Sequence, residues 1–506
     1  MSIDTLPSVF GPCPTPFNMA AHVLAKADVL RDKVALSVLS PEHREDWTFG
    51  EIELAVRGIA TGLKNAGFEA GDILLMRLGN TPDFPLCYLG ALAAGMVPVP
   101  TSSALTSGEV AKMIATLKPR AILRDPKVPC PTHRTTLMID DLRAMWKLPP
   151  APWHMGDANR LGYIIYTSGT SGVPSAVMHA HRAIWARQMM FEGWYGLREN
   201  DRVLHAGAFN WTYTLGTGLM DPWTMGATAL IPAPGTAPGD MAVMLADHKA
   251  SIFAAAPGVY RQMLNSHETL DLPDLRHGLS AGEKLSEAVK TAWKVATGRR
   301  VYEAFGMSEC STFISGSPAH PASGNTLGRP QPGRQVAIVG QDGPLSADTP
   351  GTIAIHRDDP GLMLGYLRAP DLTAARYQDE WFMTGDQGVM DASGQVTYLG
   401  RNDDMMNAGG FRVSPLEVEA ALAAAPDIDA IGVCQVQVKP DVFVIAAFYT
   451  AATPLDEGAL RRYAEAKLAR YKQPRLYIHL PTLPMGANGK LLRRSLRAAY
   501  EAENHA

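Results

Sequence analysis

Cysteine is scarce in this sequence and forms no recognisable pattern. The 506 residues contain five cysteines, which are odd in number and far apart: Cys13, Cys87, Cys130, Cys310 and Cys434. The sequence contains no CxxC pair and no Cys/His cluster. These absences argue against a disulfide framework and against a zinc site, and they favour a reducing compartment.

An excess of charge and a long apolar run are missing as well. The net charge is −4 and the pI is about 6.4, so no overall attraction to nucleic acid or anionic membranes is expected. The most apolar stretch, LCYLGALAAGMVPVP (86–100), is too short and too interrupted by proline to cross a bilayer. No basic segment followed by an apolar one opens the chain, so no signal peptide is expected. We expect a cytoplasmic protein that binds neither nucleic acid nor membrane, with the oligomeric state open and a homodimer as one option.

The length and the pattern of apolar residues predict more than one domain. Helical and strand patterns alternate from about residue 46, where Thr48 and Glu51 form a capping box at the start of a helix. This alternation predicts an α/β fold with parallel sheets. Short strands between turns from Gly333 predict a β-rich subdomain. The last hundred residues predict a small α+β domain that ends in a polar tail, with a boundary in the turn GRNDDMMNAGG (400–410).

A loop rich in glycine and hydroxyl side chains stands out at YTSGTSGVPSAVMHAHRA (166–183). A strand pattern, LGYIIY, precedes it, and AVMHAHRAIWARQMMFEGW (176–194) has the apolar spacing of a helix. A strand, a hydroxyl-rich turn and a helix are a recurrent arrangement for binding phosphate through backbone N–H groups. An ordinary loop explains this stretch equally well when it is taken alone.

Four further positions carry groups suited to nucleotide chemistry, and each also has a structural explanation. Glu309, after Ser308 in a turn, is either a solvated carboxylate or a ligand for Mg²⁺. Asp386 lies in an apolar segment and needs a partner, either a structural arginine or a ribose diol. Arg401 can neutralise Asp386 or a phosphate. Lys490, near the end of the chain, reads as a surface lysine when taken by itself.

The order of these motifs resembles that of the adenylate-forming superfamily, which includes acyl-CoA synthetases, firefly luciferase and the adenylation domains of peptide synthetases. The matching pieces, which follow the N-terminal TFGEI and GALAAGMVPVP, are YTSGTSGVPSAVMHAH, SAGEKL, AFGMSE, LGRPQPG, MLGY, WFMTGDQG, GRNDDMMNAGGFRVSPLEVE, LARYKQPR and ANGKLLRR. The likeness covers essentially the whole chain. It implies a large N-terminal adenylation domain (1–400) of parallel α/β sheets with the β-rich subdomain, and a small mobile α+β domain (401–506) that carries the catalytic lysine.

The resemblance also implies a role for individual residues. It assigns the β- and γ-phosphates of ATP to the loop Thr167, Ser168, Gly169, Thr170, Ser171 and Gly172, and the adenine to Phe305, Gly282 and Glu303. It assigns the ribose to Asp386 with Arg401, Mg²⁺ to Glu309, and the α-phosphate or the substrate carboxylate to Ser308. Lys490 would bridge that carboxylate and the α-phosphate. Asp403 would be the hinge, and coenzyme A would pass Gly409 and Gly410 and meet Lys472 and Arg475.

The implied reaction is that of an AMP-forming acid–thiol ligase. ATP and a carboxylic acid give acyl-AMP and pyrophosphate, and a thiolate then displaces AMP. Because two anions must meet, catalysis depends on positioning and on the neutralisation of charge by Lys490 and Mg²⁺. Lys490 would obstruct the second step, which explains a rotation of the C-terminal domain between the two half-reactions.

One position departs from the family pattern. The phosphate loop of the family continues Pro-Lys-Gly, whereas this chain reads Pro174-Ser175-Ala176. Loop amides and hydroxyls with Mg²⁺ can replace the lysine, Arg182 can substitute for it, or adenylation has been lost. We favour the first, because Lys490, Glu309 and the other motif residues are all present.

The acid pocket is expected along AFNWTYTLGTGL (208–219), with Trp211 and Tyr213, and along Ala281, Gly306 and Met307. The pieces YTLGTGL and SECSTFIS, and the early Phe17–Asn18, resemble benzoate and other aryl-CoA ligases more than long-chain enzymes. The two aromatic side chains suit a flat ring, or they shorten the pocket for a small or medium aliphatic acid. Coenzyme A is the expected acceptor. The alternatives are a stand-alone enzyme that loads a carrier protein and a non-catalytic sensor of nucleotide or acyl-AMP.

Overall fold

The computed structural model describes residues 10–167, 175–282, 284–401, 404–408, 411–439, 442–486 and 491–504. By residue contacts the chain divides into two compact units, residues 1–335 with 355–380 and residues 336–354 with 381–506. The predicted mobile domain, 401–506, is a part of the second unit, and its boundary remains a prediction. Among the described residues, no helix is long and apolar enough to cross a membrane.

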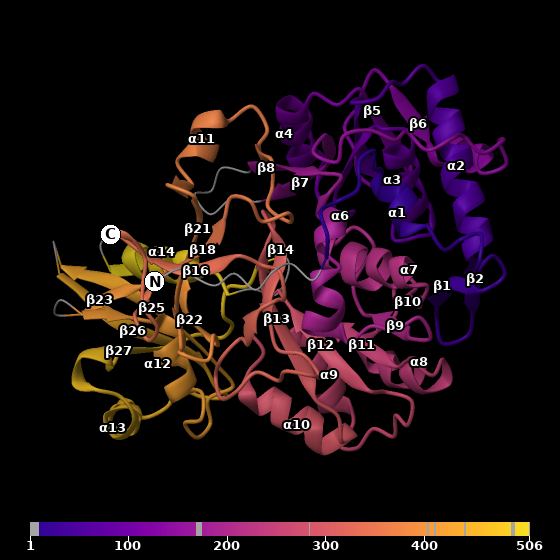
Figure 1. Ribbon diagram of the computed structural model, residues 1–506. Helices are drawn as coiled ribbons and strands as arrows, with labels where there is room; N and C mark the ends of the chain where they lie inside the picture. The colour runs from indigo at the N-terminus through magenta and orange to yellow at the C-terminus, as the bar shows by residue number, and fades with distance from the viewer. Residues whose placement is uncertain are drawn as a thin grey trace. The chain divides into compact units, whose positions relative to one another are not determined.

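The first sheet of unit one is parallel, in the order β4-β3-β5-β6. Its strands are β3 (Ile73–Arg77), β4 (Val97–Pro100), β5 (Ala121–Arg124) and β6 (Thr136–Met138), with helices α2 (Phe49–Asn65), α3 (Asp83–Ala93), α4 (Ser107–Leu117) and α5 (Ile139–Met145) around them (Figure 1, indigo to purple). The capping box predicted at Thr48 and Glu51 is present at the start of α2. Strand β4 is buried along its whole length, as parallel strands covered on both faces usually are.

The second sheet of unit one has nine strands, in the order β15-β14-β13-β12-β11-β9-β10-β1-β2. The strands from β13 (Val301–Met307) to β1 (Val34–Leu39) run parallel, through β12 (His277–Ala281), β11 (Ile252–Ala255), β9 (Arg202–His205) and β10 (Thr228–Pro232). The edge strands β14 (Ser311–Ser315), β15 (Arg329–Pro330) and β2 (Arg44–Thr48) are antiparallel. Helices α8 (Met241–Asp247), α9 (Pro257–Ser266) and α10 (Glu287–Thr297) accompany it (Figure 1). The predicted α/β class with parallel sheets is confirmed.

The helix expected over 176–194 is largely wrong. Ser175–Ala180 forms strand β8, which pairs antiparallel with β7 (Leu161–Thr167) on one side and with β19 (Gly365–Tyr366) on the other. Only short helical turns follow, α6 (Ala183–Ala186) and the π-helix η1 (Phe191–Tyr195). The apolar residues after the loop therefore form a strand of a hairpin, because the backbones of two neighbouring strands provide hydrogen-bonding partners. The phosphate loop is not followed by the N-terminus of a helix.

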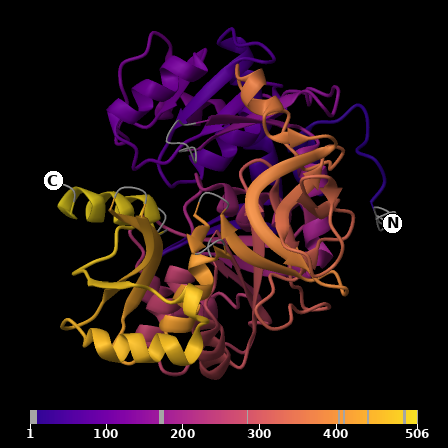
Figure 2. The same ribbon diagram turned by 90° about the vertical axis from the view of Figure 1, so that its left-hand side faces the viewer.

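Unit two contains a sheet with β16 (Val336–Gly340), β17 (Gly343–Pro344), β18 (Gly351–His356), β21 (Trp381–Met390) and β22 (Val396–Arg401), in which β16 pairs antiparallel with β17 and β21 with β22. A second sheet has the order β25-β26-β27 (Ala430–Lys439, Val442–Thr450, Leu476–His479), with helices α12 (Pro415–Leu422) and α13 (Glu457–Lys467). The C-terminal helix α14 (Arg493–Asn504) packs against β25 (Figure 2). The polar tail expected here is thus a helix, anchored by the buried Leu496.

Candidate functional site

The carboxyl ends of the parallel strands in the nine-stranded sheet bring together most of the site residues predicted for unit one. Strands β12 and β13 are adjacent, with Ser280 opposite Glu303 and Ala281 opposite Ala304. Gly282 follows Ala281 directly, and Phe305, Gly306 and Met307 end β13. Ligands of α/β proteins bind at this edge of a sheet, so the location fits the predicted nucleotide and acid sites.

The turn between β13 and β14 is held by the neighbouring hairpin. The Ser308 carbonyl oxygen lies 2.7 Å from His179 Nε2 on β8. Burial lowers the pKa of His179 to about 4, so the ring is neutral and Nε2 donates to that carbonyl. Gly306 has no room for a side chain, since a Cβ there would lie 2.2 Å from the Ser311 carbonyl oxygen. The turn that carries Ser308 and Glu309 is therefore fixed in position.

Glu309 is the predicted ligand for Mg²⁺. Its Oε1 accepts a hydrogen bond of 2.7 Å from the Tyr366 hydroxyl, and its carbonyl oxygen accepts one of 2.8 Å from Met363 N. Among the described residues, no group of three or more Cys, His, Asp or Glu side chains could hold a metal by itself. One partly exposed carboxylate nevertheless fits Mg²⁺, which typically takes one or two carboxylates, substrate phosphates and water.

Glu303 is buried and has partners in the protein. Its Oε1 accepts a hydrogen bond of 3.0 Å from Leu285 N, and its Oε2 lies 3.2 Å from Lys290 Nζ on α10. Burial raises the pKa of Glu303, and Lys290 opposes the shift. The carboxylate thus fixes the segment after Gly282, which has the positive φ of 95°. Nothing in the sequence pattern pointed to Lys290.

Trp211 and Tyr213 form a wall at the end of β12. A Cβ at Gly282 would lie 3.4 Å from Trp211 Cζ2, so the indole covers this glycine. The rings of Trp211 and Tyr213 are perpendicular, with centroids 5.0 Å apart. Both belong to a cluster with Ala281 and Ala304. The structure therefore places four of the predicted pocket and nucleotide residues, Trp211, Tyr213, Ala281 and Gly282, side by side.

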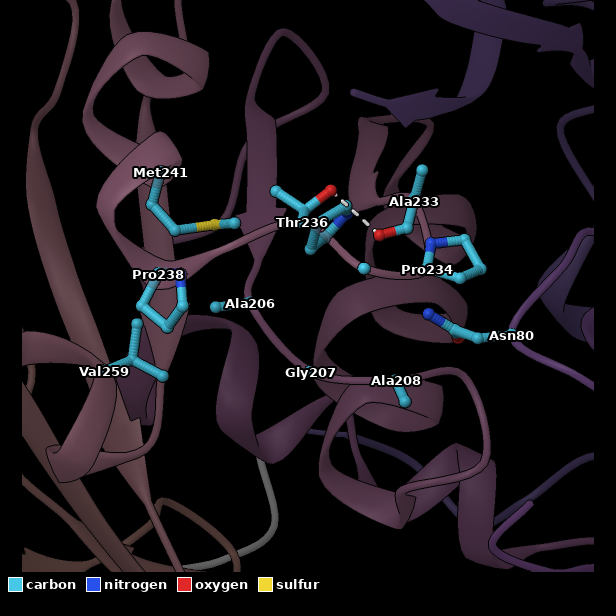
Figure 3. A pocket seen from close by; sticks show the side chains of 12 residues that line it. Asn80, Ala206, Gly207, Ala208, Ala233, Pro234, Thr236, Pro238, Met241 and Val259 are labelled. Carbon is cyan, nitrogen blue, oxygen red and sulfur yellow. Dashed lines mark hydrogen bonds between the residues drawn. The ribbon is translucent and has the colours of Figure 1, made fainter. Parts of the chain in front are cut away.

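A pocket is lined in part by the segment 206–208, which precedes Trp211. Its volume is about 190 Å³, and its described lining carries no charged side chain (Figure 3). The lining comes from the ends of β9 and β10 and from α8 and α9, and includes Gly207, Thr236, Met241 and Val259. A Cβ at Gly207 would lie 2.8 Å from Trp211 Cε3, so this lining residue also lies close to the indole.

Sequence reasoning missed a buried ion pair behind this wall. Arg187 donates to both carboxylate oxygens of Asp221, from Nε at 2.8 Å and from Nη2 at 2.6 Å. The same guanidinium bonds Ser311 Oγ, and Asp221 accepts from the Tyr195 hydroxyl at 2.7 Å. The network joins η1, α7 (Asp221–Met225) and the first residue of β14. A lone arginine and a lone aspartate give no sequence signal for such a pair.

Arg182 is not a free substitute for the missing loop lysine. Its Nε donates to Asn159 Oδ1 at 2.7 Å, and its Nη1 donates to the Pro360 and Leu362 carbonyl oxygens. The guanidinium thus holds a loop of unit one. Thr167, the first residue of the predicted phosphate loop, pairs with Ser175 in the hairpin, and its hydroxyl donates to the Ser175 carbonyl oxygen at 3.4 Å.

In unit two, Asp386 and Arg401 lie opposite each other on β21 and β22. Arg401 Nη1 is 3.9 Å from Asp386 Oδ1, and the Tyr398 hydroxyl donates to the same oxygen at 3.0 Å. Burial, together with the charge of Asp386, raises the pKa of Tyr398. Lys472 pairs with Glu417, and Arg475 is exposed.

Several predicted site residues lie outside the described part of the chain: Ser168, Gly169, Thr170, Ser171, Gly172, Asp403, Gly409, Gly410 and Lys490. Their roles remain predictions.

The fold is of the α/β class, and the predicted nucleotide and acid residues of unit one lie at the ends of parallel strands. The description of the AMP-binding enzyme family matches residues 24–367, and the chain belongs to this family. It is 28% identical to the 3-hydroxybenzoate–CoA ligase of Aromatoleum sp. (strain CIB), over 90% of this chain and 92% of that protein. It is also 28% identical to the benzoate–CoA ligase of Thauera aromatica, over 90% and 91% of the two chains.

Two solved structures share the fold across the whole length. The anthranilate CoA ligase AuaEII in complex with anthranoyl-AMP superposes with a TM-score of 0.86 at 24% identity, covering 98% of this chain and 99% of that chain. ATP-bound MatB from Rhodopseudomonas palustris superposes with a TM-score of 0.87 at 24% identity, covering 96% and 99%.

Proposed function

We propose that this protein is an aryl–CoA ligase. It converts ATP and an aryl carboxylic acid to acyl-AMP and pyrophosphate, and then transfers the acyl group to the thiol of coenzyme A with release of AMP. The observation that carries the proposal is the aromatic wall of Trp211 and Tyr213 next to Ala281 and Gly282, at the end of β12. The neighbouring strand, β13, leads to Ser308 and Glu309. The relatives named as benzoate and hydroxybenzoate ligases support an aryl acid.

In the first half-reaction, a carboxylate oxygen attacks the α-phosphorus and pyrophosphate leaves. The wall orients the ring, so that the carboxylate extends towards the β13–β14 turn, where Ser308 donates a hydrogen bond to it or to the α-phosphate. Glu309 would hold Mg²⁺, which would supply positive charge to the phosphate oxygens. Asp386 accepts hydrogen bonds from the ribose hydroxyls. Lys490 neutralises the two approaching anions.

In the second half-reaction, the thiolate attacks the acyl carbon and AMP leaves. Lys490 must withdraw first, and rotation about Asp403 moves it. The same rotation brings Gly409 and Gly410 to the pantetheine arm, with Lys472 and Arg475 near the nucleotide of coenzyme A. Arg182 is engaged elsewhere, so the charge that a lysine at position 175 would provide would have to come from the loop amides and from Mg²⁺ held by Glu309.

The two half-reactions give separate assays. Pyrophosphate release from ATP and an aryl acid reports the first, and thioester formation from synthetic acyl-AMP and coenzyme A reports the second. We expect Lys490→Ala to lower the first rate at least 100-fold and to spare the second, because only the first step joins two anions. Lys467→Ala, on the exposed side of α13, is the matched control and should change neither. An absence of pyrophosphate release with every acid would contradict the proposal, and loss of both rates in Lys490→Ala would contradict the role of this lysine.

A further inference from the structure

The hydroxyl group of Tyr213 has no hydrogen-bond partner among the described residues, although it is buried. The side chain is held by three rings, His205 at 4.4 Å, Trp211 at 5.0 Å and Trp194 at 5.8 Å between centroids. Only 9% of the residue surface is exposed. Buried polar groups nearly always have partners, so a hydroxyl held in this way points to a missing ligand group or water.

His205, the neighbouring ring, presents a second polar atom of this kind. It is fully buried, and burial lowers its pKa to about 3, so the ring is neutral. Its Nδ1 accepts a hydrogen bond of 3.0 Å from Gly207 N, and the single ring proton therefore resides on Nε2. This Nε2–H donor also has no partner among the described residues.

Tyr213 belongs to the predicted acid site, and the His205 ring packs against it, at 4.4 Å between centroids. Tyr213 shares a cluster with Ala254, Ala281 and Ala304, which lie on the adjacent strands β11, β12 and β13. The Tyr260 hydroxyl, in contrast, is anchored to the Phe253 and Leu279 carbonyl oxygens, at 3.0 Å each.

We propose that the aryl acid carries a ring hydroxyl group, which is bound by His205 Nε2–H and the Tyr213 hydroxyl; this inference rests on the proposed function. A ring hydroxyl accepts one hydrogen bond and donates another, so it satisfies the donor on His205 and pairs with the oxygen of Tyr213. An aryl amine is a poor acceptor and leaves the His205 donor unpaired. An unsubstituted ring leaves both groups unpaired, which is a strong basis for rejecting it.

The test compares benzoate, the three hydroxybenzoates and the three aminobenzoates by kcat/KM for AMP release, in the wild type and in Tyr213→Phe. We expect one hydroxybenzoate to exceed benzoate by at least 10-fold in the wild type, and Tyr213→Phe to lower that ratio by about 10- to 100-fold. Tyr260→Phe is the matched control, since it removes a hydroxyl with protein partners from the other face of the same sheet. It should leave the ratio unchanged.

Ligand-induced shifts of the unfolding midpoint, measured with the same acids and no ATP, decide the inference without turnover. A larger shift with a hydroxybenzoate than with benzoate, lost in Tyr213→Phe, supports it. A wild-type preference for benzoate, or a selectivity ratio that Tyr213→Phe leaves unchanged, overturns it and leaves the ligase standing. AMP release that needs no acid would refute the proposed function. If the protein then still bound the hydroxybenzoates more tightly than benzoate, the inference about the ring hydroxyl group would be supported.

Discussion

Replacement of Arg187 by methionine tests whether the buried ion pair supports both the fold and the acid site. Arg187 and Asp221 are almost completely buried, with side-chain exposures of 10% and 0%. Burial lowers the pKa of Arg187, but the charge of Asp221 and the hydrogen bonds between the two side chains outweigh this, and the net shift is upward. The Arg187 guanidinium therefore keeps its charge although it is buried.

The expected cost follows from what Arg187→Met leaves behind. Asp221 would keep the hydrogen bond from Tyr195 and lose both bonds from the guanidinium. An uncompensated buried charge of this kind costs about 3–5 kcal/mol of stability. In the double variant Arg187→Met/Asp221→Leu no charge remains, and the loss should shrink to about 1 kcal/mol or reverse its sign.

Urea unfolding followed by tryptophan fluorescence measures both variants, because Trp194 and Trp211 lie in the cluster next to this pair. Ser311 accepts a hydrogen bond from Arg187 and begins β14 directly after the turn with Ser308 and Glu309. The single variant should therefore also raise the KM for the acid about 10-fold, with a smaller effect on the KM for ATP. A single variant that loses less than about 1 kcal/mol, or a double variant as unstable as the single, would refute this account of the pair.

Two further predictions concern protonation and magnesium. Burial lowers the pKa of five histidines to about 3 or about 4: His22, His179, His181, His205 and His277. Between pH 6.5 and 4 only the unfolded state binds protons at these rings, so acidification should destabilise the fold. The loss of stability should reach up to about 1.4 kcal/mol per pH unit for each histidine. Urea midpoints across this range measure it, and a flat profile would contradict it. Tyr366→Phe removes the hydrogen bond to Glu309 Oε1 and should raise the Mg²⁺ concentration for half-maximal activity about 3- to 10-fold. An unchanged Mg²⁺ concentration for half-maximal activity would show that Tyr366 does not position this carboxylate.

The sequence by itself determined the family and the class of fold. The order of motifs can be read directly from a sequence, so AFGMSE, WFMTGDQG and the neighbouring motifs indicated the AMP-binding family without any structure. Local signals were sufficient where the interaction is local, as in the capping box of Thr48 and Glu51. The alternation of helix and strand patterns predicted the parallel sheets for the same reason, because burial on both faces leaves a continuous apolar run.

The tertiary structure decided whatever depends on partners far away in the sequence. The segment after the phosphate loop has a helical period, yet it forms β8, because β7 and β19 supply hydrogen bonds on both sides. Arg182 was predicted as a possible phosphate ligand, but its donors are bonded to the Asn159 side chain and to the Pro360 and Leu362 carbonyl oxygens. Tyr213 was predicted to line the acid pocket, either against a flat ring or as a side chain that shortens the pocket. Its hydroxyl is buried without a described partner because His205, Trp211 and Trp194 pack around the side chain. A pattern of residue types does not encode how side chains from separate strands and helices pack around a polar atom.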